Sequence, residues 1–258
     1  MSKQDIHTPE RWAEILKRQA DNTREFRFNL YRKVDIQSKK NILDIGCGTG
    51  VITADIASLT EGEVTGIDID DKKLEYAKGE VPDRVNLMIA DVLHLPFRDC
   101  TFDLVVFSIV LTHIHEQQEA VNEMARVTQE NGVVLATLEP DYAGMLSYPV
   151  SKAEPVFEKF MKESGIEMYT GRKLLYFFRK AGLKTEIGLF DSLSYYEKHD
   201  SETRVEEFLK TFERTEKLLR SDGWTDQEIE DHKQSELDLI KNDLAFSFCP
   251  CFYAIGRK

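Results

Sequence analysis

The chain has 258 residues, of which 41% are apolar, so it is long enough for one large domain with a substantial core. Acidic residues outnumber basic ones, 46 to 34, and the net charge of −12 disfavours binding to nucleic acid or to an anionic membrane surface. Four cysteines are too few for a disulfide framework, and the six histidines are scattered. We therefore expect neither a disulfide scaffold nor a metal site.

Neither a secretion signal nor a membrane span is predicted. The opening segment MSKQDIHTPERW is polar and charged. The longest apolar stretch, residues 104–111, is far shorter than the roughly 20 residues that a spanning helix needs. We expect an intracellular, cytoplasmic protein.

An amphipathic helix is predicted over residues 10–34, and short apolar runs alternate with helical stretches after it. Near-continuous runs of Val, Ile and Leu are typical of strands buried on both faces of a parallel sheet. Such runs cover residues 41–46, 63–68, 85–90, 102–111 and 132–139. The helices predicted between them cover residues 51–59, 71–79 and 116–130. This alternation predicts an α/β fold with an open, doubly wound sheet and right-handed crossovers.

The composition changes after Pro140, where the predicted elements become more varied. They are helices over 153–164 and 171–181, a strand over 183–193, charged helices over 201–244 and a last strand over 245–258. Pro250 falls inside that last strand and is tolerated only near a strand start, a bulge or an unpaired side.

The sharpest sequence feature is ILDIGCGTG, residues 42–50, in which glycines stand at positions 46, 48 and 50 between a strand and a helix. Gly46, Gly48 and Gly50 lack a Cβ, so a ligand can lie against the backbone, and the helix that follows begins with free N–H groups. The spacing G-x-G-x-G differs from the dinucleotide fingerprint G-x-G-x-x-G. Asp44, inside the strand, would repel a pyrophosphate but suits a ligand with an ammonium or sulfonium charge. A tight turn without a ligand is the alternative.

Two further acids end the next two predicted strands. Asp68 can bind both hydroxyls of a ribose, or it can cap the helix that follows, a role that we assign instead to Asp70 or Asp71. Asp91 can accept a hydrogen bond from an exocyclic amine while the Val92 amide donates to a ring nitrogen, or it can simply form a turn. Because all these acids follow one glycine loop on successive strands, a nucleoside site is favoured.

In their order, these segments resemble the class I S-adenosylmethionine (AdoMet)-dependent methyltransferases over about residues 40–140. Residues 42–50 are similar to the first motif of that family, VTGIDID (64–70, with Asp68 and Ile69) to its ribose-binding segment, and IADVLHLPF (89–97) to its adenine-binding segment. The likeness is nearest to the ubiquinone/menaquinone-biosynthesis type and related small-molecule methyltransferases.

The resemblance implies a Rossmann-like, mostly parallel seven-stranded sheet whose last strand is antiparallel. It also implies that AdoMet is the cofactor, that S-adenosylhomocysteine (AdoHcy) is the product, and that the acceptor is a small molecule or, alternatively, a protein. The backbone of the first motif, including Cys47, would hold the methionine part of AdoMet, and the carbonyl of Ser108 would bind its amino group.

We expect one domain over residues 1–258. Its parts are an N-terminal helical cap (1–37), an AdoMet-binding core (38–140), substrate-side helices with a sixth strand (141–200), a helical insert or lid (201–244) and the last strand (245–258).

Methyl transfer from a sulfonium requires a nucleophile placed in line at about 3–3.5 Å, exclusion of water and, for some acceptors, removal of a proton. Candidates follow the fourth and fifth predicted strands. His113 is a base or a structural histidine. Glu139, Asp141 and Tyr142 line the substrate pocket or belong to a turn built on Pro140. The acceptor atom stays open among carbon, oxygen, nitrogen and sulfur.

Arg27 and Tyr31, on the N-terminal helix, would contact the AdoMet carboxylate or cover its sulfonium; an exposed charged helix is the alternative. Cys249 and Cys251 would point to opposite faces of a strand and so would not hold one ion together. Two other functions compete with catalysis by a methyltransferase: a reductase that uses nicotinamide, and a protein that binds AdoMet without catalysis.

Overall fold

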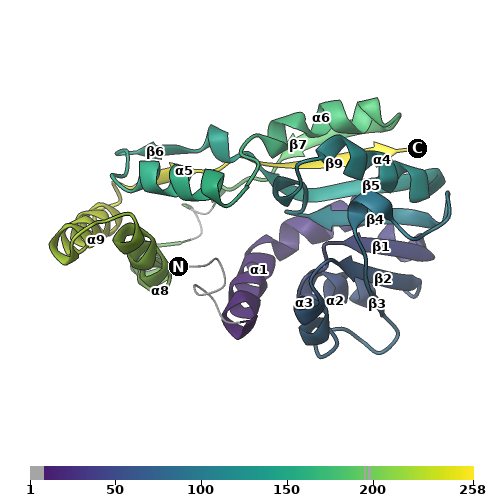
Figure 1. Ribbon diagram of the computed structural model, residues 1–258, viewed down its shortest axis with the longest axis horizontal. Coiled ribbons are helices and arrows are strands. Elements are labelled where there is room, and N and C mark those ends of the chain that lie inside the picture. The colour runs from purple at the N-terminus through teal and green to yellow at the C-terminus, as the bar shows by residue number, and fades with distance from the viewer. Residues whose placement is uncertain (1–8, 195, 197–198) are drawn as a thin grey trace.

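The computed structural model describes residues 9–194, 196 and 199–258, which form a seven-stranded sheet with helices on both faces (Figure 1). In spatial order the strands are β3 (Asn86–Ile89), β2 (Glu63–Asp68), β1 (Asn41–Ile45), β4 (Phe102–Ser108), β5 (Thr128–Pro140), β9 (Cys251–Arg257) and β7 (Lys184–Leu189). The first five are parallel to one another, whereas β9 is antiparallel to both β5 and β7. The predicted sheet with an antiparallel last strand is confirmed.

Two hydrophobic clusters attach the helices to the sheet. On one face α4 (Gln117–Val127) and α6 (Thr170–Lys180) pack against one set of inward side chains, among them Phe107. On the other face α1 (Pro9–Lys33) and α2 (Val51–Ser58) pack against the alternate set, among them Val106. Successive side chains of a strand point to opposite faces of the sheet, and helices cover both faces. Both sets of side chains are therefore apolar, which explains the continuous apolar runs in the sequence. The helix α3 (Asp71–Ala77) packs against β2 and β3.

The remaining elements form a separate layer beyond one end of the sheet (Figure 1). They are α5 (Glu154–Glu163), α8 (Ser201–Ser221), α9 (Asp226–Lys241) and a pair of short antiparallel strands, β6 (Leu146–Tyr148) and β8 (Phe246–Phe248). A third cluster, which includes Phe212 and Leu219 of α8 and Ile229 of α9, holds the helices together. We call these elements the lid layer. The helices predicted over 201–244 are confirmed, whereas the β6–β8 pair was not predicted.

Three predicted boundaries move for backbone reasons. The strand predicted over 102–111 ends at Ser108 because Ile109 has a left-handed conformation, with φ of +55°. The helix predicted to reach residue 130 ends at Val127, where β5 begins. The strand predicted over 245–258 is two strands that belong to different sheets, and Pro250, which has no N–H to donate, lies between them.

Two sequence expectations concern the ends of the chain and its passage through membranes. Residues 1–8 of the predicted cap lie outside the described residues. Within the described part of the chain, none of the helices combines the length and apolar character that crossing a lipid bilayer requires.

Candidate functional site

The glycine loop, residues 46–50, joins the end of β1 to the start of α2, and all its glycines have left-handed φ angles: +66°, +54° and +84°. A Cβ on Gly46 would lie 2.5 Å from Val110 Cγ2, and one on Gly50 would lie 2.9 Å from Val81 Cγ1. Around Gly48, in contrast, the nearest atoms to such a Cβ lie at 3.9–4.0 Å and include Asp68 Oδ2. Gly46 and Gly50 are therefore needed for close packing, whereas a Cβ on the buried Gly48 would make only ordinary van der Waals contacts.

Asp68 ends β2 and holds the glycine loop in place. Its Oδ2 accepts a hydrogen bond from the Gly48 amide at 2.8 Å, and its Oδ1 accepts one from the Asp70 amide at 2.9 Å. Each carboxylate oxygen keeps a further lone pair for a ligand hydroxyl. Asp70 caps α3, as predicted for one of the two acids at that position. Ile69, between the two acids, is 72% exposed and offers an apolar surface beside the carboxylate of Asp68.

Asp91 follows the neighbouring strand β3, which lies beside the end of β2: the Ala90 amide donates to the Asp68 carbonyl at 3.2 Å. Asp91 Oδ1 accepts from the Leu93 amide at 2.9 Å and so forms the turn into the short 3-10 helix η2 (Val92–His94). The other carboxylate oxygen of Asp91 has no partner among the described residues, so the turn and a ligand contact are compatible.

Several amides of the glycine loop are already used. Those of Cys47, Gly48 and Gly50 donate to Ile67 O, to Asp68 Oδ2 and to Cys47 O. The amides of this bend are therefore not the row of free donors that was expected. The free donors are the N–H groups in the first turn of α2, which have no partner within the helix. The Cys47 side chain is buried, and burial raises the pKa of its thiol, so only its backbone borders the site.

Asp44 lies beneath the loop rather than at its open face. Its side chain is buried, and its Oδ2 accepts a hydrogen bond from Thr53 Oγ1 at 2.6 Å. Burial raises the pKa of this carboxyl to about 7, and the Thr53 bond and the Arg27 charge oppose that rise. The predicted direct contact of Asp44 with a cationic ligand is wrong for this geometry, because the carboxylate instead fixes the start of α2.

Arg27 and Tyr31 pack into the core in this structure, where Arg27 Nε and the Tyr31 hydroxyl have no hydrogen-bond partner among the described residues, and their contact with AdoMet stays a prediction. Both side chains have no exposed surface, because the second half of α1 packs into the core. Arg27 Nη2 donates to Asp55 Oδ2 at 2.7 Å, and its Nη1 donates to Ala20 O at 2.6 Å. The first half of the helix is the part that approaches the glycine loop: Leu16 Cδ1 lies 3.9 Å from the position of a Gly48 Cβ. The apolar stripe of the helix contained this residue, but nothing in the stripe marked it as a site residue.

Glu139 was predicted to line the substrate pocket, but its side chain is fully buried at the end of β5. Its Oε1 accepts a hydrogen bond from the Val110 amide at 2.7 Å. Burial raises the pKa of this carboxyl to about 8, although amides of residues 109–112 favour the charged form. Glu139 therefore holds the turn after β4, which begins at the left-handed Ile109 and carries His113. Its Oε2 is buried without a hydrogen-bond partner among the described residues, so its place in the pocket stays a prediction.

His113 and Ser108 stand on either side of that turn. His113 is exposed in the short 3-10 helix η3 (Leu111–His113), near Asp68 and Lys73. Nearby protein atoms remove part of the water around this imidazole and the Lys73 charge repels a proton, so the pKa of His113 is lowered, while Asp68 acts in the opposite direction. The imidazole is therefore neutral near pH 7 and can accept a proton. Ser108 ends β4 and is half-buried, at the strand end where the resemblance places it.

Asp141 is committed to a structural ion pair rather than to a substrate, so its predicted pocket contact is wrong. Its buried carboxylate accepts hydrogen bonds from Arg172 Nε at 2.5 Å and from Arg172 Nη2 at 2.6 Å, and so ties the start of α6 to the end of β5. Tyr142, in the short 3-10 helix η4 (Tyr142–Gly144), is half-buried beside Cys249 and Cys251, and burial raises the pKa of its hydroxyl.

The two cysteines near Tyr142 do not alternate along one strand, because the chain breaks at Pro250. Their thiols instead meet, and the Cys251 thiol lowers the pKa of Cys249. The prediction that they face opposite sides is wrong. Across the described ranges, no group of three or more His, Cys, Asp and Glu side chains could hold a metal ion.

Alanine substitutions at Gly46 and Gly48 distinguish the cost of a steric clash from the cost of backbone strain alone. Gly46→Ala should lower the free energy of unfolding by about 2–4 kcal/mol, because the added methyl meets Val110 in a left-handed conformation. Gly48→Ala meets no close atom and should cost only about 1 kcal/mol of conformational strain. Urea unfolding of both variants measures the difference. Equal losses would show that the Val110 contact does not constrain the loop.

The buried Glu139 should make stability depend on pH. Because folding raises its pKa from 4.5 to about 8, the folded protein keeps a proton that the unfolded chain releases between these values. Stability should therefore fall as pH rises through this window, by at most about 1.4 kcal/mol per pH unit from this group.

The isosteric variant Glu139→Gln removes that contribution and should show a shallower slope in urea unfolding measured at several pH values. Asp44 titrates in both proteins, so its effect cancels in the comparison. Parallel slopes for the two proteins would contradict the assignment.

Comparisons with known proteins agree with this geometry. Residues 43–136 match the family described as "Methyltransferase domain". The methyltransferase GfsG of Streptomyces halstedii is 33% identical over 108 residues, which cover 40% of this chain and 39% of GfsG. The demethylmenaquinone methyltransferase of Lactiplantibacillus plantarum is 34% identical over 127 residues, which cover 46% of this chain and 54% of that enzyme. The chain thus spans about half, or less, of the length of these relatives.

Among solved structures, phosphoethanolamine N-methyltransferase 2 of Haemonchus contortus, in complex with AdoHcy, has the same fold. The TM-score is 0.62 at 18% identity, and the match covers 91% of this chain and 52% of that chain. The cofactor of this domain family is AdoMet. Residues 43–136 are a methyltransferase domain of the class I AdoMet-dependent family, whose menaquinone-biosynthesis members the chain resembles.

Proposed function

We propose that this protein transfers the methyl group of AdoMet to a small or medium-sized acceptor. The observation that carries the proposal is the edge formed by Gly48, Asp68 and Ile69, where a glycine without a side chain, a carboxylate with free lone pairs and an exposed apolar side chain meet. A nucleoside needs these three features: room against the backbone, an acceptor for ribose hydroxyls and an apolar surface for the base.

The residues at this edge fit AdoMet in particular. Asp68 would bind the ribose through the lone pairs that Gly48 and Asp70 leave free. Ile69 would lie against the adenine, while the free oxygen of Asp91 and the Val92 amide would bind its polar edge. The first turn of α2 and the Ser108 carbonyl would hold the methionine part. Support also comes from the relatives, whose names include demethylmenaquinone methyltransferase and O-methyltransferase.

When bound, the cofactor supplies an electrophilic methyl group on its sulfonium. The protein then has to place the acceptor, exclude water and accept a proton where the acceptor carries one. We assign proton acceptance to the neutral imidazole of His113 and a place in the pocket wall to Tyr142. Residues 38–140 bind the cofactor in this proposal, and residues 201–244 act as the lid of the same single domain.

Asp68→Ala should weaken AdoHcy binding at least tenfold, because it removes the ribose acceptor and frees the Gly48 amide. Isothermal titration calorimetry of wild type and variant measures the effect, and NADH serves as the control nucleotide. Urea unfolding shows whether the variant is still folded. Unchanged AdoHcy affinity in the folded variant, or tighter binding of NADH by the wild type, would refute the proposed site.

His113→Ala should lower methyl transfer at least tenfold while AdoHcy affinity stays within twofold, because His113 is exposed and supports no core contact. The assay follows labelled methyl from AdoMet into the small-molecule fraction of a lysate. The exposed His115, two residues along the chain, provides the matched control His115→Ala.

Three other outcomes of this assay contradict parts of the proposal. Label in the protein fraction alone would assign a protein acceptor. No label in any fraction, despite AdoHcy binding, would make the chain a non-catalytic AdoMet-binding protein. Wild-type transfer by His113→Ala would remove the histidine from catalysis.

A further inference from the structure

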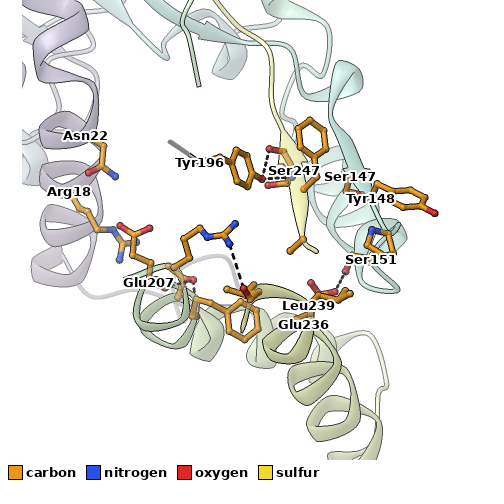
Figure 2. A pocket seen from close by; sticks show the side chains of 17 residues that line it. Arg18, Asn22, Ser147, Tyr148, Ser151, Tyr196, Glu207, Glu236, Leu239 and Ser247 are labelled. Atoms are coloured by element: carbon orange, nitrogen blue, oxygen red, sulfur yellow. Dashed lines mark hydrogen bonds between the residues drawn. The ribbon is translucent and has the colours of Figure 1, made fainter. Parts of the chain in front are cut away.

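A cavity of about 450 Å³ lies between the N-terminal helix and the lid layer, and we call it the lid cavity (Figure 2). Its walls come from α1, α8, α9 and the β6–β8 pair. A volume of this size is typical of pockets that bind small molecules, which occupy roughly 300–1,000 Å³. Figure 2 shows Arg18 and Asn22 reaching from α1 toward the side on which Ser147 and Ser247 of the small strands lie.

We propose that the lid cavity binds the part of the methyl acceptor that does not react, and that this part is a planar apolar group with a carboxylate. The inference rests on the proposed function and names the acceptor class for it. Binding energy from such a remote part of a substrate can be used to position the reacting atom.

The helix α1 lies between the cavity and the glycine loop, so an acceptor held in the cavity would extend past this helix to reach the cofactor edge. Leu16 approaches Gly48, whereas Arg18 and Asn22 line the cavity. At about 100° per residue, Arg18 and Asn22 lie roughly 200° and 240° around the helix from Leu16, and so on nearly its opposite side. A single helix thus contacts both the cofactor edge and the cavity.

The cavity wall contains hydrogen-bond donors without acceptors. Arg204 of α8 is 7% exposed, and its Nη2 pairs with Asp243, but its buried Nε has no partner among the described residues. A buried N–H without an acceptor is costly, and a ligand oxygen would remove that cost. Arg18 and Asn22 add donors that make no hydrogen bond or ion pair with the described residues. These groups favour a ligand that accepts hydrogen bonds and carries negative charge.

Both carboxylates in the wall already have partners within the protein. Glu236 Oε1 accepts a hydrogen bond from Ser151 Oγ at 2.9 Å and lies 3.7 Å from His232 Nδ1. Glu207 also has an interaction partner within the protein. The donors of Arg18, Asn22 and Arg204 Nε, in contrast, have no acceptor among the described residues, so a ligand that accepts hydrogen bonds fits this wall.

Aromatic and aliphatic side chains form the rest of the wall next to these donors. The rings of Tyr196 and Phe246 stack with centroids 5.7 Å apart and an interplanar angle of 18°. The Tyr196 hydroxyl donates to Ser247 O at 3.0 Å, which fixes the pair against β8, and the Arg204 guanidinium lies 5.4 Å from the centre of the Tyr196 ring. Leu239 of α9 extends the apolar surface. A flat apolar group therefore has a rigid surface beside the free Nε.

Three probes of nearly equal size test the chemistry: 3-phenylpropionate, 3-phenylpropionamide and 3-phenylpropylamine. Each is titrated by ligand-observed NMR into the full chain saturated with AdoHcy. The carboxylate should bind with a roughly millimolar Kd, about fivefold or more tighter than the amide, and the amine should be weakest.

Variants then assign the binding to the cavity. Arg204→Lys keeps a positive charge for Asp243 but lacks the Nε donor, and Arg18→Gln changes an exposed side chain that does not contribute to the core. Each should weaken the carboxylate about fivefold without changing AdoHcy affinity. The matched control is Arg220→Gln, on the same helix as Arg204 but paired with Glu216 outside the cavity, and it should bind like wild type.

The failure of this inference can be separated from the failure of the proposed function. If the wild type binds AdoHcy but binds none of the probes, or binds the amine best, the acceptor class is wrong while the methyltransferase proposal stands. Carboxylate binding that Arg204→Lys and Arg18→Gln both leave unchanged would place the probe outside the lid cavity. Absence of AdoHcy binding by the wild type would refute the proposed function itself.

Discussion

The hydrogen bond from the Gly48 amide to Asp68 Oδ2 is the contact on which the rest of the site depends. It joins the bend after β1 to the end of β2, and these two strands are neighbours in the sheet. The register between the strands therefore determines where the loop lies relative to Asp68. The left-handed φ angles of the loop, up to +84°, permit this approach. Because the bond uses only part of the carboxylate, the residue that shapes the loop can also face a ligand.

Buried carboxylates surround this edge and hold the backbone in place. Asp44 fixes the start of α2, Glu139 fixes the turn after β4, and Asp141 fixes the start of α6. Two of them, Asp44 and Glu139, have pKa values raised by burial to about 7 and about 8. The three carboxylates thereby fix the loops at the carboxyl ends of three strands, β1, β4 and β5. A polar residue after a strand can therefore be a positioning group, although its sequence position is that of a substrate contact.

The sequence predicted the sheet well and the roles of side chains less well, for a physical reason. The core strands and the doubly wound sheet follow from the apolar runs and the crossover rules, and the antiparallel last strand was implied by the family resemblance. Gly46 and Asp68 could be recognised by residue type and spacing. Whether the side chain of Glu139 or Arg27 faces the ligand or the core depends on how its strand or helix is rotated about its own axis. A short polar segment of sequence does not predict that rotation. The lid cavity was not predicted at all, because its walls come from segments more than 200 residues apart, such as Arg18 and Phe246.

Pro250 lies between β8 of the lid layer and β9 of the main sheet. Since it has no N–H, the chain cannot continue as one paired strand, and it passes from β8 in the lid layer to β9 in the main sheet. The Asp141 amide donates to the Pro250 carbonyl at 2.8 Å, so the break is fixed to the segment that also holds Tyr142. The small strands that wall the lid cavity are therefore anchored at the end of β5, beside the edge proposed for methyl transfer.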